Sequence, residues 1–180
     1  MVKLEMMERD VKLPDGVSVD LKKDHLTISG KKGKLTRKFT HPRVKITHSD
    51  GKLKVICPKP DRKEMGLVGT WWAHINNMVK GVNEGFHYKL RIIYSHFPIK
   101  TSVKGSELVI ENFLGERFPR RAKILEGVTA KISGDMINLE GIDKELLGQT
   151  SANIEKATIV RNYDTRVFQD GIYLVSRGNE

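Results

Sequence analysis

The feature that most restricts the fold of this chain is an internal repeat, because a series of short strands followed by one helix occurs twice within its 180 residues. In the first copy, apolar and polar residues alternate with a period of two, which predicts an antiparallel sheet with one buried face. The predicted strands of this copy cover residues 17–21, 26–30, 34–39, 44–48 and 52–56. In the second copy, residues 107–112 correspond to 26–30, and the predicted hairpin 128–139 corresponds to 44–56.

A predicted helix closes each copy. Asp61 followed by Glu64 is a capping box, and the glycines near residues 81–85 predict the end of the first helix. Its expected apolar stripe consists of Met65, Val68, Trp72, Ile75 and Val79, with the position of Trp71 left open. The second helix is expected to begin at about Asp143, and its apolar face to carry Leu146, Leu147, Thr150, Ile154 and Ala157.

The two predicted helices share a pattern of small residues. Gly69 and Ala73 in the first helix correspond to Gly148 and Ala152 in the second. Because a larger side chain would push the backbones apart, we expect each helix to lie close to its sheet at these positions.

These patterns predict an α+β fold of two tandem similar domains, each an antiparallel β-sheet packed with one main α-helix. We expect the first domain at residues 1–82 and the second at residues 83–180. A further strand, predicted at residues 87–94, follows this boundary and is compatible with either domain.

Positive charge is concentrated in the first half of the chain. The formal net charge is +10, and residues 1–80 hold 18 basic and 9 acidic side chains, whereas residues 81–180 hold 14 and 13. This excess of positive charge favours a polyanionic partner. Nucleic acid is favoured over anionic lipid, because no basic amphipathic helix accompanies the charge. The alternative is a solvated face that promotes solubility.

The sequence offers little support for an enzyme, a metal site or a membrane protein. Cys57 is the only cysteine, so no internal disulfide or paired-cysteine zinc site is expected, and a reducing compartment such as the cytoplasm fits. The glycine- and lysine-rich stretch at residues 30–34 joins two predicted strands. A phosphate loop would instead join a strand to a helix, so this stretch is not expected to be one. No membrane-spanning run, signal peptide or cofactor is predicted.

Cations alternate with aromatic residues in two segments of the second half. Residues 112–123 carry Arg117, Arg120, Arg121 and Lys123 on a predicted turn and strand, and the tail at residues 156–173 again mixes arginine with tyrosine and phenylalanine. Guanidinium groups bind phosphate oxygens and aromatic rings stack on unpaired bases, so both segments indicate RNA contact. The alternative for the first segment is a charged edge strand that prevents aggregation.

Segments along nearly the whole chain match one protein family in the same order. They are residues 77–99, 112–117, 137–143 and 149–152, Leu13-Pro14-x-Gly16-Val17, and Asp164-x-Arg166-x-Phe168-x-Asp170-Gly171-Ile172-Tyr173. The chain thereby closely resembles the large-subunit ribosomal protein six family in its archaeal and eukaryotic form. The resemblance implies two similar domains and a structural, non-catalytic role in the large ribosomal subunit of the cytoplasm.

The resemblance also implies a location and a set of contacts. It places the second domain on rRNA near the stem of the sarcin–ricin loop, beside neighbouring ribosomal proteins and where translation factors dock. Carried over residue by residue, the expected rRNA contacts are Asn112, Arg117, Arg120, Arg121, Lys123, Lys156, Arg161, Arg166 and Tyr173. In the first domain we expect an electrostatic surface, in peripheral contact with rRNA or a protein, formed by Lys31, Lys32, Lys34, Arg37 and Lys38.

Two rival functions remain open from the sequence. One is a non-ribosomal RNA-binding or ribosome-assembly protein that visits RNA transiently. The other is an enzyme on the duplicated scaffold, which would require a cleft with converging titratable groups.

Overall fold

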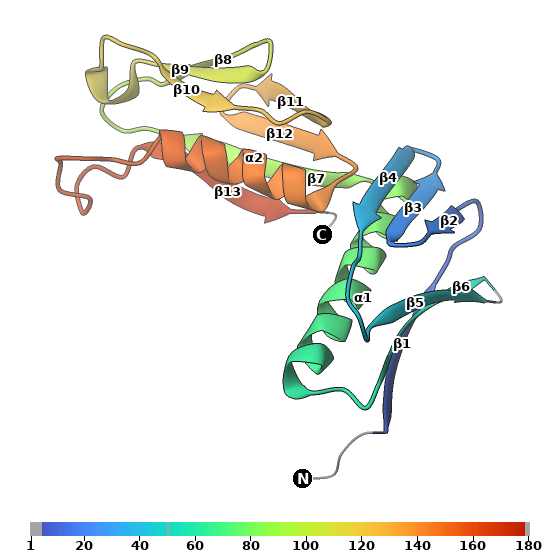
Figure 1. The fold of residues 1–180 in the computed structure, drawn as a ribbon. Coiled ribbons are helices and arrows are strands. Elements are labelled where there is room, and N and C mark those ends of the chain that lie inside the picture. The colour runs from blue at the N-terminus through green and yellow to red at the C-terminus, as the bar shows by residue number, and fades with distance from the viewer. Residues whose placement is uncertain (1–4, 50, 179–180) are drawn as a thin grey trace. The chain divides into compact units, whose positions relative to one another are not determined.

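The structure is a computed structural model that describes residues 5–49 and 51–178, and the chain folds as two compact units (Figure 1). The first unit is Met1–Glu84 and the second is Gly85–Glu180. They are the first and second domains below. The division falls after Glu84 and not after residue 82, because the first helix extends through Asn83.

The described residues of the first domain form two three-stranded antiparallel sheets and one long helix. Its elements are β1 (Met6–Lys12), β2 (Ser18–Lys22), β3 (His25–Gly30), β4 (Gly33–Lys38), β5 (Lys45–Ser49), β6 (Lys52–Pro58) and α1 (Arg62–Asn83). The sheets have the strand orders β1-β6-β5 and β2-β3-β4. The expected alternation is clearest in β6, where Leu53, Val55 and Cys57 are buried and face the same core as α1. The period of two therefore predicted this layer correctly.

Helix α1 begins as predicted, and Val68, Ile75 and Val79 of its predicted stripe lie in the core. The backbone N–H of Asp61 donates to the Glu64 carboxylate at 2.8 Å, which completes the capping box. Trp71 is 7% exposed and lies in the core, whereas Trp72 is half-buried and donates from its indole nitrogen to the Asp10 carbonyl at 2.9 Å. Trp72 thus packs against the margin of the core, on the predicted stripe, and the buried face also includes Trp71, Met78 and Val82.

Gly69 and Gly148 do not mediate close packing of the helices. A Cβ added at Gly69 or Gly148 would meet no atom within 4 Å, so the expected close approach at these positions was wrong. The close approach occurs at Gly30 instead, where an added Cβ would lie 2.8 Å from the Val82 carbonyl oxygen. That oxygen also accepts a hydrogen bond from the Lys32 backbone N–H at 2.9 Å, which holds the β3–β4 turn against the end of α1.

The second domain repeats the scheme with one additional strand. Its elements are β7 (Phe86–Ile93), β8 (Lys100–Lys104), β9 (Glu107–Glu111), a 3₁₀ turn (Phe113–Gly115), β10 (Arg120–Lys123), β11 (Val128–Ser133), β12 (Met136–Gly141), α2 (Lys144–Ala157) and β13 (Gly171–Arg177). The sheets have the orders β11-β12-β7-β13 and β10-β9-β8, and α2 packs against strands of both. The strand that the sequence left between the domains, β7, is thus a central strand of the second domain.

Two features of the second domain differ from the sequence prediction. The tail, which showed no clear periodicity, forms β13. This strand pairs with β7 in a register that places Ile172 opposite Ile92, with an irregularity between Leu174 and Ser176. Helix α2 begins after Asp143 as predicted, but Leu146 is 38% exposed and not part of the buried face. Neither helix in the described part of the chain is long and apolar enough to cross a membrane.

Candidate nucleic-acid interface

Four of the predicted contact residues lie together around one hollow of the second domain. This hollow, here called the basic hollow, has a volume of about 400 Å³ and lies between β10 and the end of α2. Its lining consists of Arg120, Arg121, Lys156, Ala157 and Arg161. Residues far apart in the sequence converge here because β10 packs directly against α2.

Arg120 forms the inner wall of the basic hollow through contacts within the protein. Its Nε and Nη2 atoms donate to the two carboxylate oxygens of Glu116 at 2.8 and 2.6 Å. Its Nη1 atom donates to the carbonyl oxygens of Ala157 and Ile159, each at 2.9 Å. The guanidinium also lies 4.2 Å from the ring centroid of Phe113. Arg120 therefore joins β10 to the chain that leaves α2, and most of its donors are occupied.

The hydrogen bond from Arg120 and the charge of its guanidinium hold the pKa of Glu116 below its usual value of 4.5, against the opposing effect of partial burial. The pair is thus an ion pair at neutral pH.

The other cations of the basic hollow are available to a ligand. Arg121 is 66% exposed in its side chain and makes one ion pair, with Glu107 at 3.4 Å, of a kind that contributes little when both partners are solvated. Lys156 and Arg161 are exposed, and neither side chain has a partner among the described residues. Three exposed cations around one hollow favour a ligand with several negative charges.

The remaining predicted residues of the second domain do not line the basic hollow. Arg117, Lys123 and Arg166 are exposed, and their side chains have no partner in the part of the chain that the structure describes. Asn112 has a structural role, because it adopts a left-handed backbone with φ of 59° and its side-chain amide donates to the Pro98 carbonyl at 3.1 Å. It fixes the turn that leads to Arg117.

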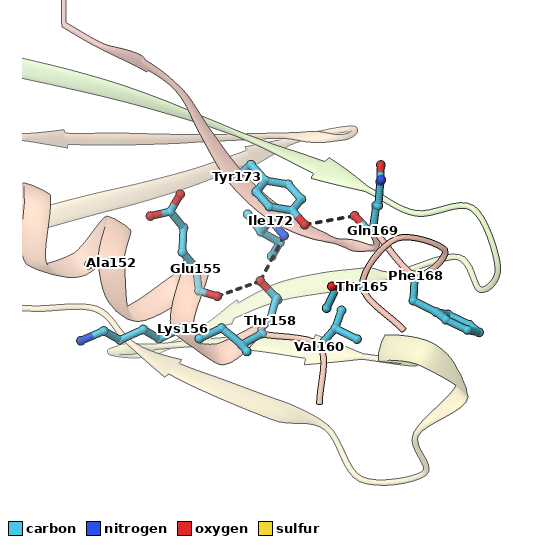
Figure 2. Close-up of a pocket in the computed structure, with 11 residues that line it drawn as sticks. Ala152, Glu155, Lys156, Thr158, Val160, Thr165, Phe168, Gln169, Ile172 and Tyr173 are labelled. Carbon is cyan, nitrogen blue, oxygen red and sulfur yellow. Dashed lines mark hydrogen bonds between the residues drawn. The ribbon is translucent and has the colours of Figure 1, made fainter. Parts of the chain in front are cut away.

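A second hollow lies beside the basic hollow, and Lys156 lines both. This tail pocket has a volume of about 430 Å³ and lies between the end of α2, the start of β13 and the loop that joins them (Figure 2). Its lining residues are Ala152, Glu155, Lys156, Thr158, Ile159, Val160, Thr165, Phe168, Gln169, Ile172 and Tyr173. Tyr173 is the one predicted contact residue that it adds.

Hydrogen bonds fix the walls of the tail pocket. The Thr158 hydroxyl donates to the Glu155 carbonyl and accepts from the Ile172 backbone N–H, each at 3.1 Å, which ties β13 to the end of α2 (Figure 2). The Tyr173 hydroxyl donates to the Gln169 carbonyl, also at 3.1 Å. The sequence did not identify Thr158 as important, because its role depends on a strand that periodicity did not predict.

A buried carboxylate anchors the loop that frames the tail pocket. Asp170 is 1% exposed and accepts hydrogen bonds from the backbone N–H groups of Ser95 and His96 at 3.3 and 3.4 Å. The Nδ1 atom of His96 lies 3.2 Å from the same carboxylate, and the His96 ring stacks on Phe168 with centroids 4.4 Å apart. The loop is therefore connected to the segment after β7. The family motif contains Asp170, but only the structure shows its partners.

The five predicted cations of the first domain do not share one surface. Lys34 and Lys38 lie on the exposed face of β4, and Lys31 and Lys32 lie in the turn before that strand. Arg37 points to the opposite face of β4, where its Nη1 atom lies 3.2 Å from Nδ1 of His74 on α1. The alternation along the strand separates Arg37 from the lysines.

Within the described residues, no group of three or more histidine, cysteine, aspartate or glutamate side chains is placed to hold a metal ion. Cys57 is buried in the first domain, and burial raises the pKa of its thiol above the usual value of 9.0, with the Glu64 charge adding to this effect. A buried thiol of raised pKa is a poor nucleophile.

The chain is similar to ribosomal proteins in both of its halves. A family model described as Ribosomal protein L6 matches residues 13–85 and, separately, residues 97–171. The large ribosomal subunit protein uL6 of Thermoplasma acidophilum is 45% identical over 170 residues, which are 94% of this chain and 96% of the relative. The protein of the same name from Methanococcus vannielii is 42% identical over 175 residues, which are 97% of this chain and 96% of the relative. Each copy of the internal repeat thus carries one match.

Proposed function

Since the chain belongs to the ribosomal protein L6 family, we propose that it is a structural component of the large ribosomal subunit and binds rRNA through its second domain. The family is one of structural ribosomal proteins and not of enzymes, which agrees with the expectation from the sequence. We further propose that the bound rRNA is near the stem of the sarcin–ricin loop, in the region where translation factors dock, and that the protein works in the cytoplasm.

The observation that carries this proposal is the convergence of three exposed cations on the basic hollow. Arg121, Lys156 and Arg161 neutralise closely spaced phosphates, and this sequence-independent attraction supplies most of the affinity. Arg120 acts differently, because its hydrogen bonds to Glu116 and to the end of α2 keep the wall of the hollow in place. Arg117, Lys123 and Arg166 extend the contact along the exposed surface.

The uneven distribution of charge is compatible with this assignment. Net charge governs long-range attraction, whereas a specific site needs only a few cations in suitable positions. The nearly neutral second half of the chain can therefore supply the phosphate contacts proposed here. We propose that Lys31, Lys32, Lys34 and Lys38 of the first domain form a solvated electrostatic surface at the periphery of the rRNA or beside a neighbouring protein.

A charge-reversal experiment with matched variants tests the proposal. One variant changes Arg121, Lys156 and Arg161 to glutamate, and the control changes Lys31, Lys32 and Lys34 to glutamate, so both alter the net charge equally. Large subunits are then sedimented through high salt. We expect the first variant to be lost from the subunit and the control to remain.

Two outcomes would contradict the proposal. Loss of the control with retention of the first variant would place the main rRNA contact in the first domain. Release of the wild-type protein from the subunit by high salt would favour a protein that visits RNA transiently, for example during ribosome assembly.

A further inference from the structure

We infer that the tail pocket binds one unpaired base of the rRNA, while the phosphates next to that base lie in the basic hollow. The inference rests on the proposed function and specifies the chemistry of the contact. The phosphate contacts proposed above lie at the basic hollow and leave the tail pocket without a ligand. The inference assigns one to it.

The form of the tail pocket suits a flat, mostly apolar group with polar edges. Its volume of about 430 Å³ lies within the range of small-molecule sites, and Val160, Phe168 and Ile172 provide apolar wall. Polar atoms are present at the loop: neither the Thr165 hydroxyl nor Oε1 of Gln169 has a partner among the described residues. A base combines a large apolar face with donors and acceptors at its edge, which is the combination that these walls offer.

Tyr173 is held in one orientation at the rim of the tail pocket. Its hydroxyl donates to the Gln169 carbonyl (Figure 2). An added Cβ at Gly171 would lie 3.0 Å from its ring, so the ring rests directly on the glycine. The residue is nevertheless 44% exposed. An aromatic ring that is both fixed and exposed loses little conformational freedom when a base stacks on it.

The connection to the basic hollow favours a nucleotide over other occupants. Lys156 lines both hollows, and no partner for its ammonium group is found in the described residues. A base in one hollow therefore has its own backbone beside the cations of the other. Sequence-independent phosphate contacts and a pocket for a splayed base are the two parts of recognition in single-stranded loops and bulges of RNA.

Chemical probing of rRNA bound to the protein tests the inference. Large-subunit rRNA of the same organism, transcribed in vitro, is bound to wild-type protein. Dimethyl sulfate and a water-soluble carbodiimide then report the exposure of unpaired bases, and hydroxyl radicals report the exposure of the backbone. We expect at least one unpaired base to be protected in addition to the backbone.

Variants connect that protection to the tail pocket. Thr165→Trp places a large ring in the mouth of the pocket at an exposed position, and Thr129→Trp is the matched control on β11 outside it. We expect Thr165→Trp to return the protected base to the reactivity of free rRNA while the rRNA backbone stays protected. Thr129→Trp should change neither the base protection nor the backbone protection. Tyr173→Ala provides an independent variant with the same expected loss of base protection.

The inference fails if wild-type protein protects no unpaired base, or if both Thr165→Trp and Tyr173→Ala protect the base fully. It also fails if every base stays reactive and Thr165→Trp instead releases a neighbouring protein from purified subunits, since the pocket would then bind protein. In each case backbone protection that depends on Arg121, Lys156 and Arg161 would leave the proposed function intact. Absence of that backbone protection would contradict the proposed function itself.

Discussion

Arg120 and Glu116 form a two-point ion pair in which Nε and Nη2 of the arginine lie 2.8 and 2.6 Å from the two carboxylate oxygens. The geometry matches the planar fork of a guanidinium to a carboxylate, which a lysine in the same position could not reproduce. Because the same arginine also binds two carbonyl groups at the end of α2, the pair connects the turn after β9 to the basic hollow.

Replacement of Glu116 by glutamine should lower the stability of the second domain at neutral pH by about 1 kcal/mol, a modest value because the carboxylate is partly solvated. The ion pair lowers the pKa of Glu116, so its contribution is present above the usual value of 4.5 and is lost as the pH falls through the lowered pKa. The difference between wild type and Glu116→Gln should therefore disappear at low pH. Urea unfolding can be followed by the tyrosine signal, since all four tyrosines lie in the second domain.

Two neighbouring arginines should respond differently to alanine substitution. Arg121→Ala should reduce the slope of log K against log salt for rRNA binding by about 1, because one phosphate contact is lost. Arg120→Ala should leave this slope unchanged and instead destabilise the second domain, since its donors are bound within the protein. A reduced slope for Arg120→Ala with unchanged stability would show that Arg120 contacts phosphate directly.

Gly30→Ala should destabilise the first domain by about 1–3 kcal/mol. The new methyl group would collide with the Val82 carbonyl and push the β3–β4 turn away from α1. Gly69→Ala is the control, and it should stabilise α1 by about 0.5–1 kcal/mol because open space surrounds that position. Tryptophan fluorescence during urea unfolding measures both effects, since Trp71 and Trp72 are the only tryptophans. Equal effects of the two substitutions would contradict the close approach at Gly30.

Asp170→Asn should destabilise the second domain by about 2 kcal/mol, because Ser95 and His96 donate to different carboxylate oxygens and the amide nitrogen that replaces one of them cannot accept. His96→Ala should cost less, about 1 kcal/mol, since the backbone N–H groups of Ser95 and His96 would still donate to Asp170. Urea unfolding detected by circular dichroism distinguishes the two. A larger loss in His96→Ala would mean that the ring, and not the backbone, holds the carboxylate.

The elements that depend on local pattern were predictable from the sequence. The alternation in β6, the capping box at Asp61 and Glu64, and the start of α2 at Asp143 each depend on a few adjacent residues. The repeat itself was also recoverable, and the family match to each half confirms it.

The features that depend on partners distant in sequence were not predictable. Nothing in the sequence near Arg120 reveals that its guanidinium donates to the carbonyl groups of Ala157 and Ile159. The width of the face of α1 that meets the core depends on where the sheets lie, so periodicity left the position of Trp71 open, although Trp71 is 7% exposed and lies in the core. Strand β13 showed no period of two because its exposed positions include Tyr173 and Val175, which are as apolar as the inward-facing residues between them.

The position of β13 also has a consequence for the time course of synthesis. The first domain has all its elements once Glu84 has left the ribosome that makes the chain, so it can fold early. The sheet of the second domain is different, because Gly171 must reach Ile93 before β7 gains its second neighbour. Until β13 has been synthesised, the tail pocket lacks the wall formed by Ile172 and Tyr173, so a nascent chain completes its first domain well before it can bind a base.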